Sequence, residues 1–194
     1  MSKYISRLMS SSSGGTPAVS TFSVRESPHL PGHLVVHPLG YPADVPPIFT
    51  ILTSKSKPNV SVFRGHPDPV NKIGDATMHT FSSTIDLNHR GQTATLKENS
   101  LSGNFTLASP LGKFKWTVNP ITGTGLELKD GTGMKLASLK SAGFPGSGER
   151  KLELFVSCDD MFLELIVLSA MTAKNSQKET NEAIGEVVGA AAGA

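Results

Sequence analysis

Three histidines recur at every fourth position near the start of the chain, at His29, His33 and His37. On a helix this spacing would place three imidazoles on one face, where they could bind zinc. Pro31 and Gly32 lie between them and disfavour a helix, and no cysteine or nearby carboxylate completes a set of four ligands. The sequence therefore predicts no metal site and no cofactor.

A second combination that could do chemistry is the segment RGHPDP, in which His66 and Asp68 could form an acid–base pair. A polar loop explains the same residues equally well. The lone Cys158 precedes Asp159 and Asp160, which disfavour a reactive thiolate. Because no catalytic set is complete, we expect a non-enzymatic protein. An enzyme that uses His66 and Asp68 in a pocket at a barrel end is the alternative.

The basic residues indicate a third kind of site, one that binds anions. Near an anionic membrane each lysine or arginine contributes about 1 kcal/mol, so a cluster of three or four would give weak, salt-sensitive binding to phospholipid headgroups. The alternative is a set of solvated cations that only keep the protein soluble. Four of the candidate cations could gather at one end of the fold and two form an outward pair on a single strand: Lys55, Lys57, Arg64 and Lys72, and Lys113 with Lys115.

Composition limits the partners that this chain can have. Its 194 residues carry 18 basic and 16 acidic side chains, so no strong overall field points to nucleic acid. The sequence contains no run of 18 or more apolar residues, so it predicts no transmembrane helix. We therefore expect a phospholipid headgroup or a protein as the partner, and a third alternative is a structural or stress-related protein without a ligand.

The single cysteine excludes an internal disulfide, which suits a reducing compartment. We expect a cytoplasmic monomer. The first 25 residues contain no acidic side chain and several serines, which are traits of a mitochondrial transit peptide, so a mitochondrial location is the alternative.

The elements that must position these residues are short strands. From Pro47 onward, alternating runs such as GKFKWTV (112–118) and GLELKD (125–130) are separated by turns rich in Gly, Asn and Pro, at a spacing of roughly 8 to 12 residues per strand. No helix separates successive strands. The pattern predicts an antiparallel barrel or sandwich with Phe114 and Trp116 on its buried face.

One apolar helix is predicted over residues 159–173. Asp159 or Asp160 can cap its first turn. Between Met161 and Met171 only Glu164 and Ser169 are polar, so the helix needs enclosure on most sides. A closed barrel threaded by the helix supplies that enclosure, with three core residues from the helix: Phe162, Leu165 and Ile166.

The expected organisation has three parts. Residues 1–46 are rich in Ser, Gly and Pro and predict a disordered leader. Within it, HLVV (33–36) could form an edge strand. Residues 47–174 form the barrel with its helix. Residues 175–194 predict a flexible C-terminal tail.

The runs GKFKW, LELKD, GMKLASLK and RKLELFV, followed by MFLELIVLSAMTA, resemble the tubby C-terminal-like superfamily. Within that superfamily the similarity is greatest to fungal proteins of unknown function, and plant LURP-one-related proteins and phospholipid scramblases are more distant. The resemblance covers about residues 47–174 and implies a barrel of about twelve strands threaded by a C-terminal helix. Tubby proteins bind phosphoinositides and scramblases move lipids with bound calcium, but neither set of ligands maps onto this sequence. The resemblance therefore implies the fold and makes a membrane lipid the first partner to test.

Overall fold

The strands of this protein form one closed barrel around a single long helix. The computed structural model describes residues 17–119, 125–142 and 148–192, and of residues 181–192 it describes the helical backbone alone. A short 3-10 helix, η1 (Pro69–Asn71), precedes the fifth strand, and α1 (Asp160–Ala192) follows the last strand. In chain order the strands are β1 (Ser20–Glu26), β2 (His33–Pro38), β3 (Phe49–Thr53), β4 (Val60–Arg64), β5 (Lys72–Thr77), β6 (Thr84–His89), β7 (Gln92–Asn99), β8 (Asn104–Ser109), β9 (Gly112–Val118), β10 (Leu126–Lys129), β11 (Lys135–Ser141) and β12 (Arg150–Leu154).

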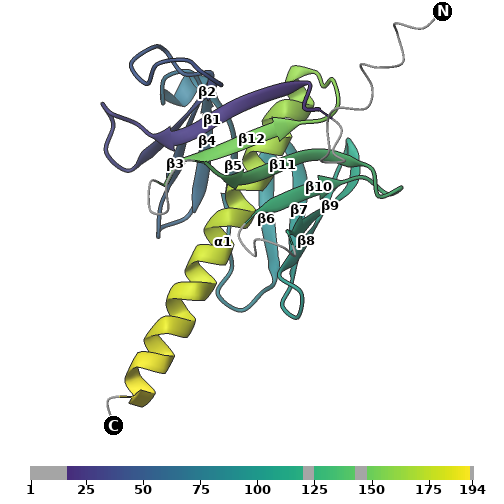
Figure 1. The fold of residues 1–194 in the computed structure, drawn as a ribbon. Helices are drawn as coiled ribbons and strands as arrows, with labels where there is room; N and C mark the ends of the chain where they lie inside the picture. The colour runs from purple at the N-terminus through teal and green to yellow at the C-terminus, as the bar shows by residue number, and fades with distance from the viewer. Residues whose placement is uncertain (1–16, 120–124, 143–147, 193–194) are drawn as a thin grey trace, which may run out of the picture.

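Each strand pairs antiparallel with the next strand along the chain, and β1 pairs with β12 to close the ring (Figure 1). At this closure the register runs from Ser20 opposite Leu154 to Val24 opposite Arg150. Closed sheets with many strands leave an interior wider than a side-chain core needs, which makes room for a helix. The prediction of a mainly β protein with a closed antiparallel barrel and one C-terminal helix is confirmed.

The N-terminal part of the barrel differs from the prediction. The expected disordered leader, residues 1–46, contains β1 and β2, so that prediction is wrong for these two strands. The possible strand at HLVV (33–36) is observed as part of β2, but β2 pairs with strands on both sides and is not an edge strand. Pro28 and Pro31 lie in the β1–β2 connection, and Pro38 is the last residue of β2, opposite Phe22, so no proline lies in the interior of either strand. Residues 1–16 lie outside the described part of the chain.

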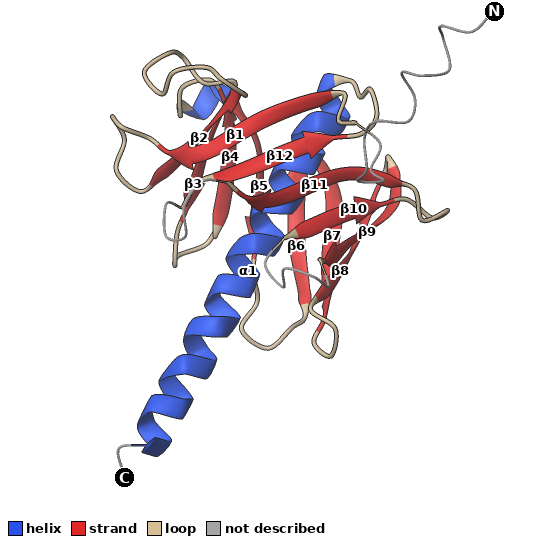
Figure 2. Ribbon diagram, in the orientation of Figure 1, coloured by secondary structure: helices blue, strands red, loops and turns tan. Residues whose placement is uncertain are grey.

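The helix α1 begins where the sequence predicts and continues much further. The Asp159 carboxylate accepts a hydrogen bond from the backbone N–H of Phe162 at 2.8 Å, which caps the first turn. Every residue from Glu164 to Ala173 is buried, and Figure 2 shows the helix surrounded by strands over this part. None of the described helices is both long and apolar enough to span a membrane.

The predicted end of the helix at residue 173 is wrong, because α1 extends to Ala192. The segment expected to be a flexible tail contains no proline, and extending a helix that is already nucleated costs little per residue. Its projecting turns leave the barrel in Figure 1. Residues 193 and 194 lie outside the described part.

The core lies between α1 and the inward faces of the strands. Trp116, Leu165 and Ile166 are fully buried, as predicted, and the Trp116 indole N–H donates to the Ser169 hydroxyl at 3.0 Å. Phe114 and Phe162 are only half-buried and pack against each other with ring centroids 5.2 Å apart. Ser169, the second polar residue of the apolar helix, thus accepts the hydrogen bond of the buried Trp116 indole.

Successive strands run in opposite directions, so their connections alternate between the two ends of the barrel. The β2–β3, β4–β5, β6–β7, β8–β9 and β10–β11 connections share one end, where α1 begins, and we call it the helix-start end. The β1–β2, β3–β4, β5–β6, β7–β8, β9–β10 and β11–β12 connections share the other. Because α1 leaves the barrel there, we call it the helix-exit end.

Candidate anion-binding cavity

The six predicted cations do not form one cluster. Lys55 and Lys57 are exposed on the β3–β4 connection at the helix-exit end, whereas Lys113 and Lys115 are exposed on the outer face of β9. Lys72 lies at the helix-start end and its ammonium is 2.8 Å from the Asp75 carboxylate. These lysines are therefore spread over separate surfaces.

Arg64, the sixth predicted cation, is part of an ionic cluster at the helix-start end. It ends β4, and its Nη2 lies 2.8 Å from Oε1 of Glu164 and 3.0 Å from Oδ2 of Asp160. Arg90 grips the same Glu164 carboxylate through both oxygens, with Nε 2.6 Å from Oε2 and Nη2 2.7 Å from Oε1. Nε2 of His89 lies 3.3 Å from Oε2. Arg64 and Arg90 are therefore already paired with carboxylates of α1.

The turn between β6 and β7 aims Arg90 at α1. Arg90 has a φ of 49° and Gly91 a φ of 77°, so both central residues of this two-residue hairpin have positive φ, as a type I′ turn requires. A positive φ is unfavourable for a residue with a side chain. The two hydrogen bonds that Arg90 donates to Glu164 offset that cost.

The Glu164 side chain is fully buried and stays ionised because of its partners. Burial by itself would raise its pKa, but the hydrogen bonds from Arg90, Arg64 and His89 outweigh burial and lower the pKa to about 2. The same hydrogen bonds raise the pKa of Arg64 and of Arg90. The cluster therefore fixes the first turns of α1 in the barrel and has a structural role.

The predicted acid–base pair has no side-chain contact. His66 and Asp68 are both exposed on the β4–β5 connection, and the Asp68 carboxylate accepts from the backbone N–H of Val70 as the cap of η1. The pKa of the Cys158 thiol is raised by burial and then by Asp159 and Asp160. Neither feature supplies an activated catalytic group.

The helix-exit end contains a cavity of about 610 Å³ between α1 and the ends of β1, β2, β3 and β12. This volume lies within the range of small-molecule sites, which is about 300 to 1,000 Å³. Leu34 and Met171 form part of its apolar lining. Its charged lining consists of Arg150, Lys174 and Lys178, with Glu26 as the carboxylate.

Arg150 reaches the cavity because of its position in β12. Alternate residues of a strand face the same side, and Leu152 and Leu154 of this strand are buried in the core. Arg150 is two residues before Leu152, so it continues the inward row at the mouth of the barrel, where it pairs with Val24 of β1. Among the described residues, no carboxylate lies within ion-pair distance of Arg150.

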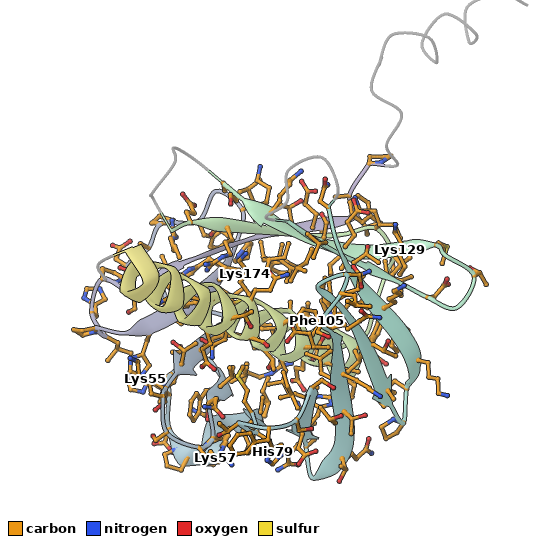
Figure 3. The ribbon with its side chains drawn as sticks, turned by 90° about the horizontal axis from the view of Figure 1, so that it is seen from below. Lys55, Lys57, His79, Phe105, Lys129 and Lys174 are labelled. Carbon is orange, nitrogen blue, oxygen red and sulfur yellow. The ribbon has the colours of Figure 1, made fainter. Side chains whose placement is uncertain are left out.

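The lysines reach the cavity from α1. Met171, Lys174 and Lys178 are spaced three and four residues apart, which places them on one face of the helix. Figure 3 shows Lys174 beside α1, well separated from Lys55 and Lys57 on the rim. Met171 thus lines the inner part of the cavity with an apolar side chain, and Lys174 and Lys178 line its part nearer the end of the barrel.

Two cations of this cavity, Arg150 and Lys174, are partly desolvated. Burial lowers the pKa of Arg150. Burial also lowers the pKa of Lys174, and the positive charge of Arg150 lowers it further. Two like charges that repel each other in a half-buried cavity are stabilised by an anion placed between them. The site is therefore suited to a phosphate or carboxylate group.

A metal ion is not the ligand that these side chains favour. Within the described residues, no three His, Cys, Asp or Glu side chains come together as a potential metal site. Guanidinium and ammonium groups are donors only, and they match the oxygens of an anion.

The sequence analysis did not select Arg150 and Lys174, although the spacing of each from neighbouring core residues indicates that it faces inward. In RKLEL the alternation that makes Leu152 and Leu154 inward-facing also turns Arg150 inward. Lys174 follows Met171 by three residues in the apolar helix and so shares its face. A cation at a core-facing position is a stronger indication of a ligand than a cation on a solvated face.

Comparison of the chain with family models, with curated proteins and with solved structures finds no significant match.

Proposed function

We propose that this protein is a non-enzymatic binding module whose cavity holds the phosphate group of an anionic lipid. The observation that carries the proposal is the inward-facing Arg150, half-buried in a cavity and without a carboxylate partner among the described residues. A buried cation is costly unless an anion accompanies it.

The shape of the site favours an amphipathic anion over a bare ion. Leu34 and Met171 offer apolar contacts inside the cavity, and Arg150 and Lys174 offer donors. A phospholipid has both parts, since acyl carbons can contact the apolar lining while the phosphate accepts hydrogen bonds from the cations.

The barrel with its C-terminal helix also supports a proposal of membership in the tubby C-terminal-like superfamily, in which lipid recognition occurs. The cavity adds an argument that does not depend on that resemblance, because it rests on the charge and burial of Arg150 and Lys174 in this chain.

A soluble short-chain lipid tests the proposal without a membrane. We expect isothermal titration of the full chain with dihexanoyl phosphatidic acid, below its micelle concentration, to show one site. Charge-assisted hydrogen bonds contribute about 1.5 to 3 kcal/mol, so Arg150→Met should weaken binding at least about tenfold, and Lys174→Met should also weaken it.

Lys113→Met is the matched control, because Lys113 is exposed on the outer face of β9 and should not affect the titration. No binding by the wild type, or an equal loss with Lys113→Met, would contradict the proposal.

A further inference from the structure

We propose that an open hollow at the helix-exit end of the barrel binds a neutral saccharide, with the ring of Phe81 as the surface on which a sugar stacks. The hollow has a volume of about 550 Å³, which is within the range of small-molecule sites. Among the described residues, its lining shares none with the cavity at Arg150, so this inference does not rest on the proposed function. The lining consists of Lys57 from the β3–β4 connection, residues 79–82 from the β5–β6 connection, and Thr84 and Asp86 from β6.

Hydrogen bonds hold the two connections that form the hollow in place. The side-chain oxygen of Asn59 accepts from the backbone N–H of Met78 at 2.8 Å, which ties the β3–β4 connection to the β5–β6 connection. Within the β5–β6 connection, the backbone N–H of Ser82 donates to the carbonyl oxygen of His79 at 3.2 Å, so residues 79–82 form a turn. A lining that is fixed before the ligand arrives loses less freedom on binding.

Phe81 lies in this turn and extends its ring into solvent. Its relative exposure is 101%, so it contributes nothing to the core. Single exposed apolar side chains are common on protein surfaces, and exposure alone indicates no site. Phe81, however, borders a hollow whose other side chains are polar. The face of an aromatic ring carries partial negative charge, so it attracts the C–H groups on the apolar face of a sugar ring.

The polar side chains of the hollow offer both acceptors and donors. Asp86 lies on the outer face of β6, because Ile85 and Leu87 on either side of it are buried. Its Oδ2 is 2.9 Å from Nε2 of His79, and its side chain is 58% exposed, so the carboxylate can also accept from ligand hydroxyl groups. Lys57 adds an ammonium donor, and Figure 3 shows it near His79. Sugar hydroxyl groups both donate and accept, which matches this mixed set.

The charge of the lining favours an uncharged ligand. Lys57 contributes one positive and Asp86 one negative formal charge, which balance. Three more charged residues are close in the chain or across the sheet but lie outside the lining: Lys55, Lys97 and Glu98. The Glu98 carboxylate accepts a hydrogen bond from a hydroxyl of α1. A phosphate or carboxylate in the hollow would meet the exposed carboxylate of Asp86, whereas a neutral saccharide meets no like charge.

A panel of immobilised neutral oligosaccharides of glucose, galactose, mannose and N-acetylglucosamine tests the hollow with the full chain. We expect binding to at least one member, whose affinity is then measured in solution by calorimetric titration. Phe81→Ala should weaken that binding at least about fivefold, because it removes the stacking surface. Asp86→Asn should weaken it about tenfold, because it removes a charged acceptor. Added salt should leave the affinity unchanged, since the ligand carries no charge.

Leu101→Ala is the matched control. Leu101 is 98% exposed on the β7–β8 connection at the same end of the barrel and lies outside the lining of the hollow. Its replacement should not change saccharide binding. Because neither Phe81 nor Leu101 contributes to the core, both variants should unfold at the temperature of the wild type, which separates lost binding from lost folding.

Three results would overturn the saccharide site: no binding of the wild type to any oligosaccharide of the panel, an equal loss with Leu101→Ala, or full binding by Phe81→Ala. Adenosine is the competing probe, because a nucleobase also stacks on an aromatic ring. Binding of adenosine without binding of any saccharide would likewise overturn the proposal. Titration with dihexanoyl phosphatidic acid should be the same for Phe81→Ala as for the wild type, and a loss there would contradict the separation of the hollow from the cavity.

Discussion

Both ends of the barrel place an arginine beside α1, and among the described residues the two ends differ in whether a carboxylate pairs with that arginine. At the helix-start end, Arg64 and Arg90 hold the buried Glu164 within 2.8 Å. At the helix-exit end, Arg150 and Lys174 face a cavity, and no described carboxylate pairs with Arg150. Arginine therefore stabilises the fold at one end, and at the other end Arg150 lines a cavity without a carboxylate partner among the described residues.

Glu164→Gln should have the largest effect on stability. A neutral amide weakens the hydrogen bonds that Arg64 and Arg90 donate to Glu164, and since a hydrogen bond to a charged group contributes about 1.5 to 3 kcal/mol, the total loss should be about 3 kcal/mol. Urea denaturation measures this loss. Asp160→Asn is the control, because the Asp160 side chain is 71% exposed and should cost less than about 1 kcal/mol. Equal effects would contradict a special role for the buried carboxylate.

The pH dependence of stability should trace to the same carboxylate. The folded-state pKa of Glu164 is about 2, below the ordinary value of 4.5. Its contribution is therefore complete above pH 4.5 and is lost as the pH falls toward 2. Each pH unit in this window removes about 1.4 kcal/mol, so about 2 kcal/mol should be gone by pH 3.

The measurement is the difference in unfolding free energy between the wild type and Glu164→Gln, taken at several pH values so that the other carboxylates cancel. A difference that stays constant down to pH 3 would show that Glu164 titrates normally.

A pair of identical substitutions compares the two ends directly. Arg90→Met removes two hydrogen bonds from a buried carboxylate and should cost about 2 to 3 kcal/mol. Arg150→Met removes a cation that has no carboxylate partner in the described part of the chain, so its stability should stay within about 0.5 kcal/mol of the wild type. Thermal and urea denaturation of both variants check this. Equal destabilisation would mean that Arg150 is as structural as Arg90.

Gly74→Ala tests how closely the barrel approaches the helix near its start. A Cβ at Gly74 would lie 2.7 Å from the Asn88 carbonyl oxygen and 2.9 Å from Cδ2 of Leu168. Forcing that contact should destabilise the protein by about 1 to 3 kcal/mol. Gly131→Ala, whose Cβ would meet no atom within 4 Å, should change the unfolding free energy by less than about 1 kcal/mol.

The architecture could be predicted because the two-residue alternation of the strands and the apolar pattern of the helix are both visible in short stretches of sequence. Alternation in GKFKWTV and the lack of a polar face in α1 depend only on neighbouring residues, and together they require a closed sheet around the helix. Glu164 and Ser169 were visible as the polar residues of that helix. Their partners Arg64, Arg90 and Trp116 are 53 to 100 residues away in the chain, and pattern reading does not pair residues at such distances.

The errors also have physical causes. β1 was missed and β2 was expected only as a possible edge strand, because a single sequence does not show that Pro28 and Pro31 lie in the connection between the two strands. The predicted cations were chosen because they could gather on the surface, whereas the cavity depends on Arg150, whose inward direction follows from its alternation with Leu152 and Leu154 along β12.

The most direct test of the central claim is a crystal structure of the full chain with dihexanoyl phosphatidic acid. We predict that its phosphate oxygens lie within hydrogen-bonding distance of the Arg150 guanidinium and the Lys174 ammonium, inside the cavity at the helix-exit end. A phosphate bound at the outer lysines of β9, or an empty cavity at saturating lipid, would contradict the claim.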